Sequence, residues 1–330
     1  MVAAVTSGST SYTQSAYDLI CGALRLCSVI ADDETPIPSS ATNALSSLNA
    51  MVKGWQASGI HVWTQEEAIL FLQPNQPQYS LGTGSTDSAC LYTDLLETSL
   101  SASAGAAATS VTLASTTGIV SGTYVGVQLD AGTNFFTTAT GPGVAGVVPL
   151  ASPLPSAATS GALAFAYQTP LIRPLRAPAG RRYLLSTKIA TPMIPLSRVD
   201  YDMLPNQYNP GTVTQYFFDP QTGNNSYTNA LALMNLWPMP ADNTAALRFI
   251  SQRPLQSFST LANVPDFPDE WVAALKWNLA EEIALEFDVP ADRLATIRDR
   301  AAFWFDLVKA WDREPESILF GVAFQPGYRR

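Results

Sequence analysis

The hydrophobic positions near the start of the chain recur with the spacing of an α-helix. Between residues 14 and 29 they follow each other at steps of three and four, and they do so again from residue 40 until Gly59. This period places apolar side chains on one helical face, and glycine commonly follows a helix end. Two amino-terminal helices are therefore predicted, with the stripes Tyr17, Ile20, Leu24 and Cys27, and Leu45, Leu48, Val52 and Trp55.

Two further helices are predicted near the carboxyl end. Pro268 and Pro290 suit the first turn of a helix, and Pro315 suits a stop. The apolar stripes are Trp271, Leu275, Leu279, Ile283 and Phe287, followed by Leu294, Ile297, Ala301, Trp304, Val308 and Trp311. We expect all four helices to pack together, with a candidate bundle core of Leu24, Leu48, Trp55, Trp271, Leu275, Leu279, Ile283 and Trp304.

The residues between these helices have the pattern of short strands. An apolar run covers Ile69 to Leu72, and β-type runs occur at 182–189, 213–218, 230–237 and 246–252, separated by Gly, Pro and Asn. Between 98 and 172, alternating segments such as Val125 to Leu129 are separated by glycine-rich turns. The aromatic residues there, Phe135, Phe136, Phe165 and Tyr167, favour a folded domain over a low-complexity linker.

Together these patterns predict an α+β fold. In it a helical bundle from the N- and C-terminal helices carries a β-rich middle and an inserted small β-sandwich or barrel domain. Only Asp130 is charged between Glu97 and Arg173. The predicted domains are therefore residues 1–97 with 173–330, which include a tail at 316–330, and an inserted Ser/Thr/Ala/Gly-rich domain at 98–172.

The composition indicates in addition that much of the protein's surface contacts other protein subunits. Charged residues make up 14% of the 330-residue chain, against about 25% in ordinary soluble domains. The net charge of −9 argues against a nucleic-acid binder that works through a basic surface, because phosphate neutralisation needs Lys and Arg. The charge is compatible with a wall past which DNA slides without binding.

The cysteines and the lack of long apolar runs restrict the cellular compartment that we expect for the protein. Cys21, Cys27 and Cys90 lack metal-site spacing and are predicted to be buried thiols in a reducing compartment. No stretch reaches the roughly 18 consecutive apolar residues of a membrane helix. Residues 1–13 have no basic region of the kind that begins a secretory signal, and are expected to form an arm.

Candidate chemistry is sparse. His61 is the single histidine and is interpreted as structural, and no Gly-Lys-Ser/Thr phosphate loop occurs. The carboxylate groups that could serve glycan hydrolysis are Glu66 with Glu67, Glu281 with Glu282, and the run Asp32, Asp33 and Glu34. Neighbouring helical residues point about 100° apart, so Glu281 and Glu282 cannot flank one bond. The sequence predicts a protein that is not an enzyme, with no catalytic residue, cofactor or metal.

Five segments, taken in their order along the chain, carry a family resemblance. They are Ala23-Leu24-Arg25-Leu26; Leu48–Trp55 before Ser58-Gly59-Ile60; Gln73–Tyr79 before Ser80-Leu81-Gly82; Leu236–Pro240 before Pro265–Trp271; and Ala274–Ala280. Together they resemble the head-to-tail adaptor proteins of short-tailed bacteriophages, also called tail accessory or head completion factors. The resemblance covers residues 1–90 and 170–330. Cys27-Ser28 stands where a capping glycine is common, and the shortest relatives lack the insertion.

The resemblance implies a structural virion protein at the head-tail junction, assembled in the host bacterial cytoplasm. Such proteins form a homo-oligomeric ring, typically of twelve subunits, which joins the portal protein to the tail tube or nozzle protein and continues the DNA channel. Tail fibres are a further candidate partner; DNA is not bound specifically, and no membrane is involved. Helices and terminal arms dock on the portal in such proteins, which points here to Ile318, Phe320, Phe324, Tyr328, Arg329 and Arg330.

Two other functions are compatible with the sequence. One is a peptidoglycan hydrolase carried in the virion, which would use one of the carboxylate groups. The other is a glycan-binding or decoration protein that uses the low-charge segment at 98–172.

Overall fold

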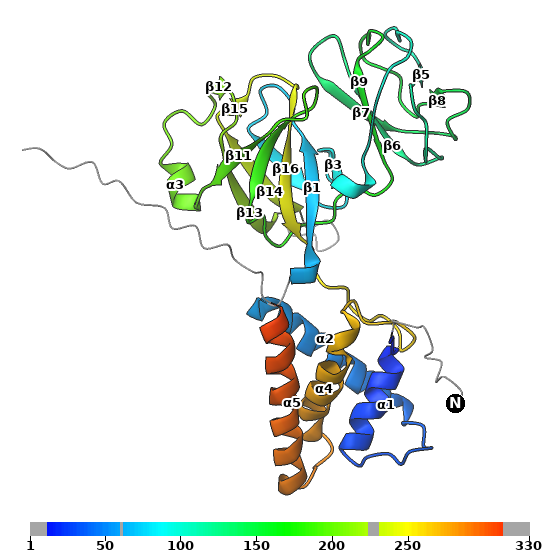
Figure 1. The fold of residues 1–330 in the computed structure, drawn as a ribbon, viewed down its shortest axis with the longest axis vertical. Coiled ribbons are helices and arrows are strands. Elements are labelled where there is room, and N and C mark those ends of the chain that lie inside the picture. Colours follow the sequence, from blue (N-terminus) through cyan, green and yellow to red (C-terminus); the bar gives the residue numbers. More distant parts are fainter. Residues whose placement is uncertain (1–11, 60–61, 224–230, 313–330) are drawn as a thin grey trace, which may run out of the picture. The chain divides into compact units, whose positions relative to one another are not determined.

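A computed structural model of the chain describes residues 12–59, 62–223 and 231–312. The chain divides into two compact units (Figure 1). The first, called the helical unit, is Met1–Trp63 with Leu255–Arg330, and the second, called the sheet unit, is Thr64–Pro254.

The helical unit contains four long helices. They are α1 (Ala16–Leu26), α2 (Pro38–Ser58), α4 (Val272–Ala284) and α5 (Ala291–Trp311), with a short 3-10 turn, η3 (Asp269–Trp271), before α4. Helix α4 lies in the middle and packs against the other three. Local signals set the helix ends, since Ser15 and Asp18 form a capping box at α1 and Gly59 ends α2 in the left-handed conformation.

An aromatic cluster forms the centre of this unit. The Trp271 side chain is completely buried, and its ring centroid lies 5.8 Å from that of Trp55 and 4.9 Å from that of Trp63. Phe305 of α5 packs on Trp55 at 5.0 Å, so the cluster joins α5 to α2 and to the start of α4. Of the predicted core residues, all but Trp304 are buried, and Trp304 is half-buried against the same core.

The sheet unit is built on an eight-stranded sheet in the order β2-β14-β13-β11-β10-β16-β1-β3. The strands are β1 (Gln65–Phe71), β2 (Gln78–Leu81), β3 (Ala89–Leu91), β10 (Gly180–Leu184), β11 (Ala190–Pro195), β13 (Gln215–Gly223), β14 (Leu231–Trp237) and β16 (Ala245–Gln252). All neighbours are antiparallel except β11 and β13. Short elements of this unit are η2 (Tyr92–Asp94), α3 (Arg198–Asp202), and the pair β12 (Pro210–Gly211) and β15 (Met239–Pro240), while η1 (Val62–Thr64) spans the division between the two units.

The low-charge segment forms a second, smaller sheet in the same unit. Its order is β4-β9-β6-β7, with β4 (Leu96–Ser99), β6 (Tyr124–Gln128), β7 (Asn134–Thr138) and β9 (Leu163–Tyr167), beside a ribbon of β5 (Ser110–Thr112) and β8 (Val147–Pro149). The two sheets share a core, in which Phe71 of β1 meets Phe165 of β9 at 4.6 Å and Phe136 of β7 at 5.0 Å.

The predicted fold class is wrong. The structure is mixed α/β, with 29% of the described residues in strands and 27% in helices, and its main element is the large sheet, nearly closed as a barrel. A terminal helical bundle that carries a separate β-sandwich does not describe it. The reason lies in the aromatic residues of the low-charge segment, since Phe165, Tyr167 and Phe136 pack on residues of the large sheet.

The compact units also divide the chain elsewhere than at the predicted domain boundaries. They divide at 63/64 and 254/255, whereas composition indicates 97/98 and 172/173. The low-charge segment has a sheet of its own but lies inside the sheet unit. The core of that segment is lined by Val, Leu and Ala side chains, among them Val111, Val125 and Leu150, while most of its polar residues are hydroxylic rather than charged.

Gly126 provides a test of the packing between β6 and β7. It pairs with Phe136, whose ring covers the position that a side chain at Gly126 would occupy. We expect Gly126→Ala to lower the free energy of unfolding by about 1–3 kcal/mol, because overpacking forces the ring to move. Gly105→Ala is the matched control, since nothing lies within 4 Å of its added methyl group. Equal urea midpoints for the two variants would contradict this packing.

The capping box of α1 predicts a pH effect. The Asp18 carboxylate accepts hydrogen bonds from the Ser15 backbone N–H and hydroxyl at 3.0 and 2.6 Å, which lower the pKa of Asp18 below its ordinary value of 3.8. A carboxyl with a lowered folded-state pKa stabilises the fold above its unfolded value and loses this effect as the pH falls through the folded value. Asp18→Asn should therefore cost about 0.5 kcal/mol near pH 6. In chemical unfolding, this difference should shrink below about pH 4.

Candidate functional site

Groups that could carry enzyme chemistry are dispersed over the described residues. No three His, Cys, Asp or Glu residues among them lie together as a metal site would require. Cys21, Cys27 and Cys90 are free and buried. Burial raises the pKa of Cys27 to about 11 and that of Cys90 further still, so both stay protonated at neutral pH. His61 lies outside the described residues.

The glutamates of β1 form two separate ion pairs. Glu66 pairs with Arg253 at 3.2 Å, and Glu67 pairs with Arg248. Since successive side chains of a strand point to opposite faces, the two carboxylates cannot flank one substrate bond. Each carboxylate has an arginine partner from β16 or the residue that follows it, which favours a structural role for both.

Arg248 is the most constrained of these charges. Its Nε and Nη2 atoms donate to the two Glu67 oxygens at 2.9 and 2.5 Å, so the pair is bidentate. The guanidinium lies 3.8 Å from the centre of the Tyr92 ring. The hydrogen bonds that it makes with Glu67 are the largest cause of the raised pKa of Arg248. This arrangement holds η2, and with it the start of the low-charge segment, against the large sheet.

The remaining carboxylate candidates are exposed or paired within the chain. Glu281 of α4 lies 3.5 Å from Arg298 of α5, so the two helices are joined by an ion pair. Asp32, Asp33 and Glu34 are exposed in the loop between α1 and α2. The Glu34 carboxylate accepts from the backbone N–H of Ala31 at 3.1 Å, which fixes part of the loop.

A cavity of about 350 Å³ lies in the sheet unit between residues 82–88 and the small sheet. Its lining includes Tyr124 and Tyr167, whose rings stack in parallel with centroids 5.0 Å apart. Hydroxyl groups of Ser and Thr supply most of its polar lining, and the one carboxylate, Asp87, already accepts from the Ser80 backbone N–H and hydroxyl. These groups can bind polar ligands but offer no acid–base pair.

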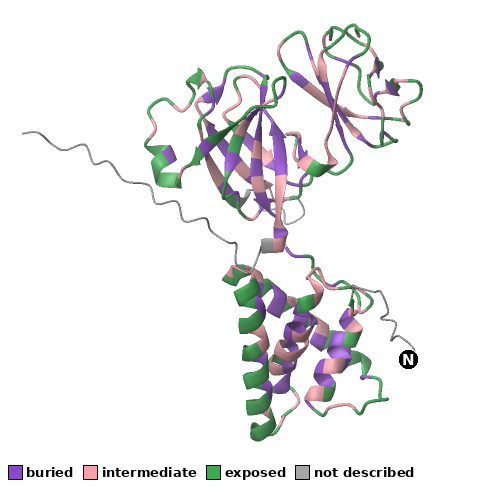
Figure 2. Ribbon diagram, viewed as in Figure 1, coloured by how far each residue is buried: buried purple, intermediate pink, exposed green. Residues whose placement is uncertain are grey.

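The clearest unusual surface lies on α5. Phe303, Leu307 and Trp311 are 54%, 52% and 64% exposed, although all three are large and apolar. They follow each other at steps of four and therefore share one side of the helix. Figure 2 shows the exposed side of α5 along its whole length. We call these three residues the α5 stripe. Beside it Glu270, Trp304 and Val308 help to line a hollow of about 410 Å³.

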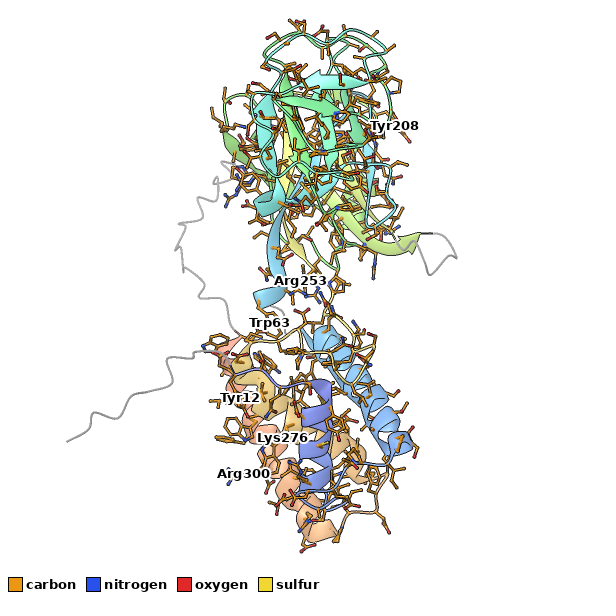
Figure 3. The ribbon with its side chains drawn as sticks, turned by 90° about the vertical axis from the view of Figure 1, so that its right-hand side faces the viewer. Tyr12, Trp63, Tyr208, Arg253, Lys276 and Arg300 are labelled. Carbon is orange, nitrogen blue, oxygen red and sulfur yellow. The ribbon has the colours of Figure 1, made fainter. Side chains whose placement is uncertain are left out.

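A second exposed apolar group lies in the sheet unit. Ile194 of β11 and Val199 of α3 are exposed, and Met203, just past α3, is 77% exposed. The nearby hollow contains the Arg198–Asp219 ion pair and the exposed Tyr208, which is labelled in Figure 3. The two units thus each present large apolar side chains on their surfaces.

The predicted docking residues Ile318, Phe320, Phe324, Tyr328, Arg329 and Arg330 lie outside the described residues. Trp311 is predicted from the sequence to belong to the buried stripe of α5, and the structure exposes it. The predicted stripes do not include Phe303 and Leu307, although the sequence carries a signal for them. Apolar residues at 303, 307 and 311 form a second stripe beside the one at 297, 301 and 308.

Comparison with known proteins adds no identification, since no protein-family model and no curated protein sequence matches the chain. Among the described helices, none combines the length and apolar character needed to cross a membrane.

Arg248 can be tested by a conservative substitution. Arg248→Lys keeps the charge but removes the bidentate pair with Glu67 and weakens the contact with Tyr92, because an ammonium is not a planar fork. We expect a loss of about 1 kcal/mol in the free energy of unfolding, since the pair is partly solvated. Arg181→Lys, at an exposed position on the neighbouring strand β10, is the control and should change little. Denaturant titration of both variants gives the comparison, and equal stabilities would contradict this role.

Proposed function

We propose that the protein is a structural subunit of a bacteriophage particle, placed at the junction between head and tail. In this proposal it forms a homo-oligomeric ring, which joins the portal protein to the tail tube or nozzle protein and continues the DNA channel. The proposal rests on the family resemblance of five sequence segments, and it is supported by the character of the surface.

The observation that carries the proposal is exposed apolar surface on a chain with few charges. Scattered exposed apolar residues are normal, but grouped ones mark contact surfaces. The α5 stripe is such a group, and the apolar residues around β11 and α3 form another. A ring subunit buries two flanks as well as its ends. Several apolar groups can therefore serve as contact surfaces, and less of the surface has to be charged to stay solvated.

The net charge fits passage of DNA better than binding of DNA. At −9 per chain, a ring of many copies is strongly anionic. Acidic groups near the lumen repel phosphates and let the duplex slide. DNA is therefore a passenger in this proposal and not a ligand.

The peptidoglycan hydrolase alternative is less well supported. It requires two carboxylates placed across one bond, a few ångströms apart. Glu66 and Glu67 are bound to different arginines, and Glu281 pairs with Arg298. The glycan-binding alternative has the tyrosine-lined cavity as its one specific support. We therefore propose a non-enzymatic role, without a cofactor, in the virion.

The decisive experiment measures the mass of the full chain by light scattering, alone and with a purified portal ring. We expect a ring in at least one of the two conditions, because the exposed apolar groups need partners. A protein that is monomeric alone but assembles on the portal satisfies the proposal. A chain that remains monomeric and unbound in the presence of portal overturns it. Clearing of a cell-wall zymogram by the purified chain would instead favour the hydrolase.

A further inference from the structure

The α5 stripe continues into a basic segment on the same side of the helix. Residues 293, 300, 303, 307 and 311 follow each other at steps of seven, three and four, and so form one strip along α5. Arg293 and Arg300 are exposed at its amino-terminal half, and Figure 3 shows Arg300 at the edge of the helical unit. The strip is distinct from the buried side of α5, which Ile297, Ala301 and Val308 define. An apolar patch with two cations beside it is therefore open on this helix.

The loop between α1 and α2 presents the complementary features. Asp32, Asp33 and Glu34 are exposed there, and Ile37, three residues further on, is 68% exposed. The loop thus offers anions and one large apolar side chain within six residues. The turn between Ala31 and Glu34 is fixed by hydrogen bonds in both directions, so the loop presents a defined surface.

The two surfaces lie on different flanks of the same unit. Helix α4 separates α1 from α5, as Figure 1 shows. The loop lies at the end of the unit where α5 begins, so it is level with the amino-terminal half of that helix. Among the described residues, no ion pair joins Arg293 or Arg300 to the acidic loop of the same chain. The strip and the loop can meet when copies of the chain are placed side by side. Such a contact is heterologous, and repetition of it closes a ring when the rotation between copies allows.

We propose that the α5 strip of one subunit binds the 32–37 loop of the next copy of this chain. Arg293 and Arg300 pair with the acidic loop, while Phe303 and Leu307 cover Ile37. On the far side of the strip lie Asp292, Asp299 and Asp306. The hollow that the acidic loop lines also contains Arg25 and Lys276, which can pair with these aspartates. This inference rests on the proposed ring function and names the contact that builds the ring.

A charge exchange tests the contact in the full chain. Arg300→Glu should weaken self-association at least about tenfold, because it places a carboxylate against the acidic loop. Asp33→Arg should do the same, and the double variant should regain association. Lys309→Glu is the matched control, since Lys309 is exposed on another side of α5. The readouts are mass by light scattering, alone and on the portal ring, and thermal unfolding to verify folding.

Mixing the two single variants gives a second readout that depends on the heterologous geometry. Each variant keeps one of the two surfaces unchanged. In the proposed geometry, the strip of the Arg300→Glu variant then binds the loop of the Asp33→Arg variant through the two introduced charges. The unchanged strip of the second variant binds the unchanged loop of the first. Equimolar mixing should therefore restore association beyond that of either variant alone.

Each other outcome overturns the contact. Unchanged mass in both single variants, or a double variant that does not recover, excludes this pairing of surfaces. Weaker portal capture at unchanged self-association would identify the portal as the occupant of the strip. Lower thermal stability of Leu307→Asp at unchanged mass would identify another segment of the same chain. In all three cases the proposed function is still supported if the wild-type chain forms a ring. If the wild-type chain stays monomeric in the presence of portal, the proposed function itself is overturned.

Discussion

Burial of strand β1 on both faces is the constraint on which the sheet unit depends. Ala68 and Leu70 point into one core, whereas Ile69 and Phe71 point into the other. A strand in the middle of a sheet, with apolar side chains on both faces, must be covered twice. The large sheet covers one face by curling towards a barrel, and the small sheet covers the other through Phe165 and Tyr167. The low-charge segment is therefore part of the support of the large sheet.

The few ion pairs of this low-charge chain lie where particular strands or helices meet. Arg248 and Arg253 hold Glu67 and Glu66 where β1 pairs with β16, and Arg298 joins α5 to α4 through Glu281. Partly solvated pairs of this kind add little stability, but they fix which elements meet. Most other surface positions carry hydroxyl or small apolar side chains, so recognition by neighbours depends on shape and on a few clustered charges such as those at 32–34 and on α5.

The helices could be predicted from the sequence because their signals are local. The stripe from Trp271 to Ile283, the stop at Gly59 and the start at Pro290 lie within a few residues of the helices that they define. Strand order could not be predicted, because pairing is non-local: β2 pairs with β14, about 150 residues away. The predicted fold class is wrong for the same reason. Low charge at 98–172 indicates a separate domain, but it says nothing of the Phe71 side chain against which that segment packs. The exposure of the α5 stripe does not follow from the sequence pattern, because apolar residues in a helix are first assigned to a core.

The chain enters and leaves the sheet unit at one place. Thr64 accepts a hydrogen bond from the backbone N–H of Arg253 at 3.0 Å, and Gln65 pairs with Gln252 directly beyond. The unit is thus a cassette with adjacent ends, inserted between α2 and α4 of the helical unit. Closing such a short gap costs little conformational entropy. The same helical unit could therefore carry sheets of other sizes, or a tight turn, without a change in its own core. Exchange of the cassette would offer a route by which related chains diverge on the outside while the helices are retained.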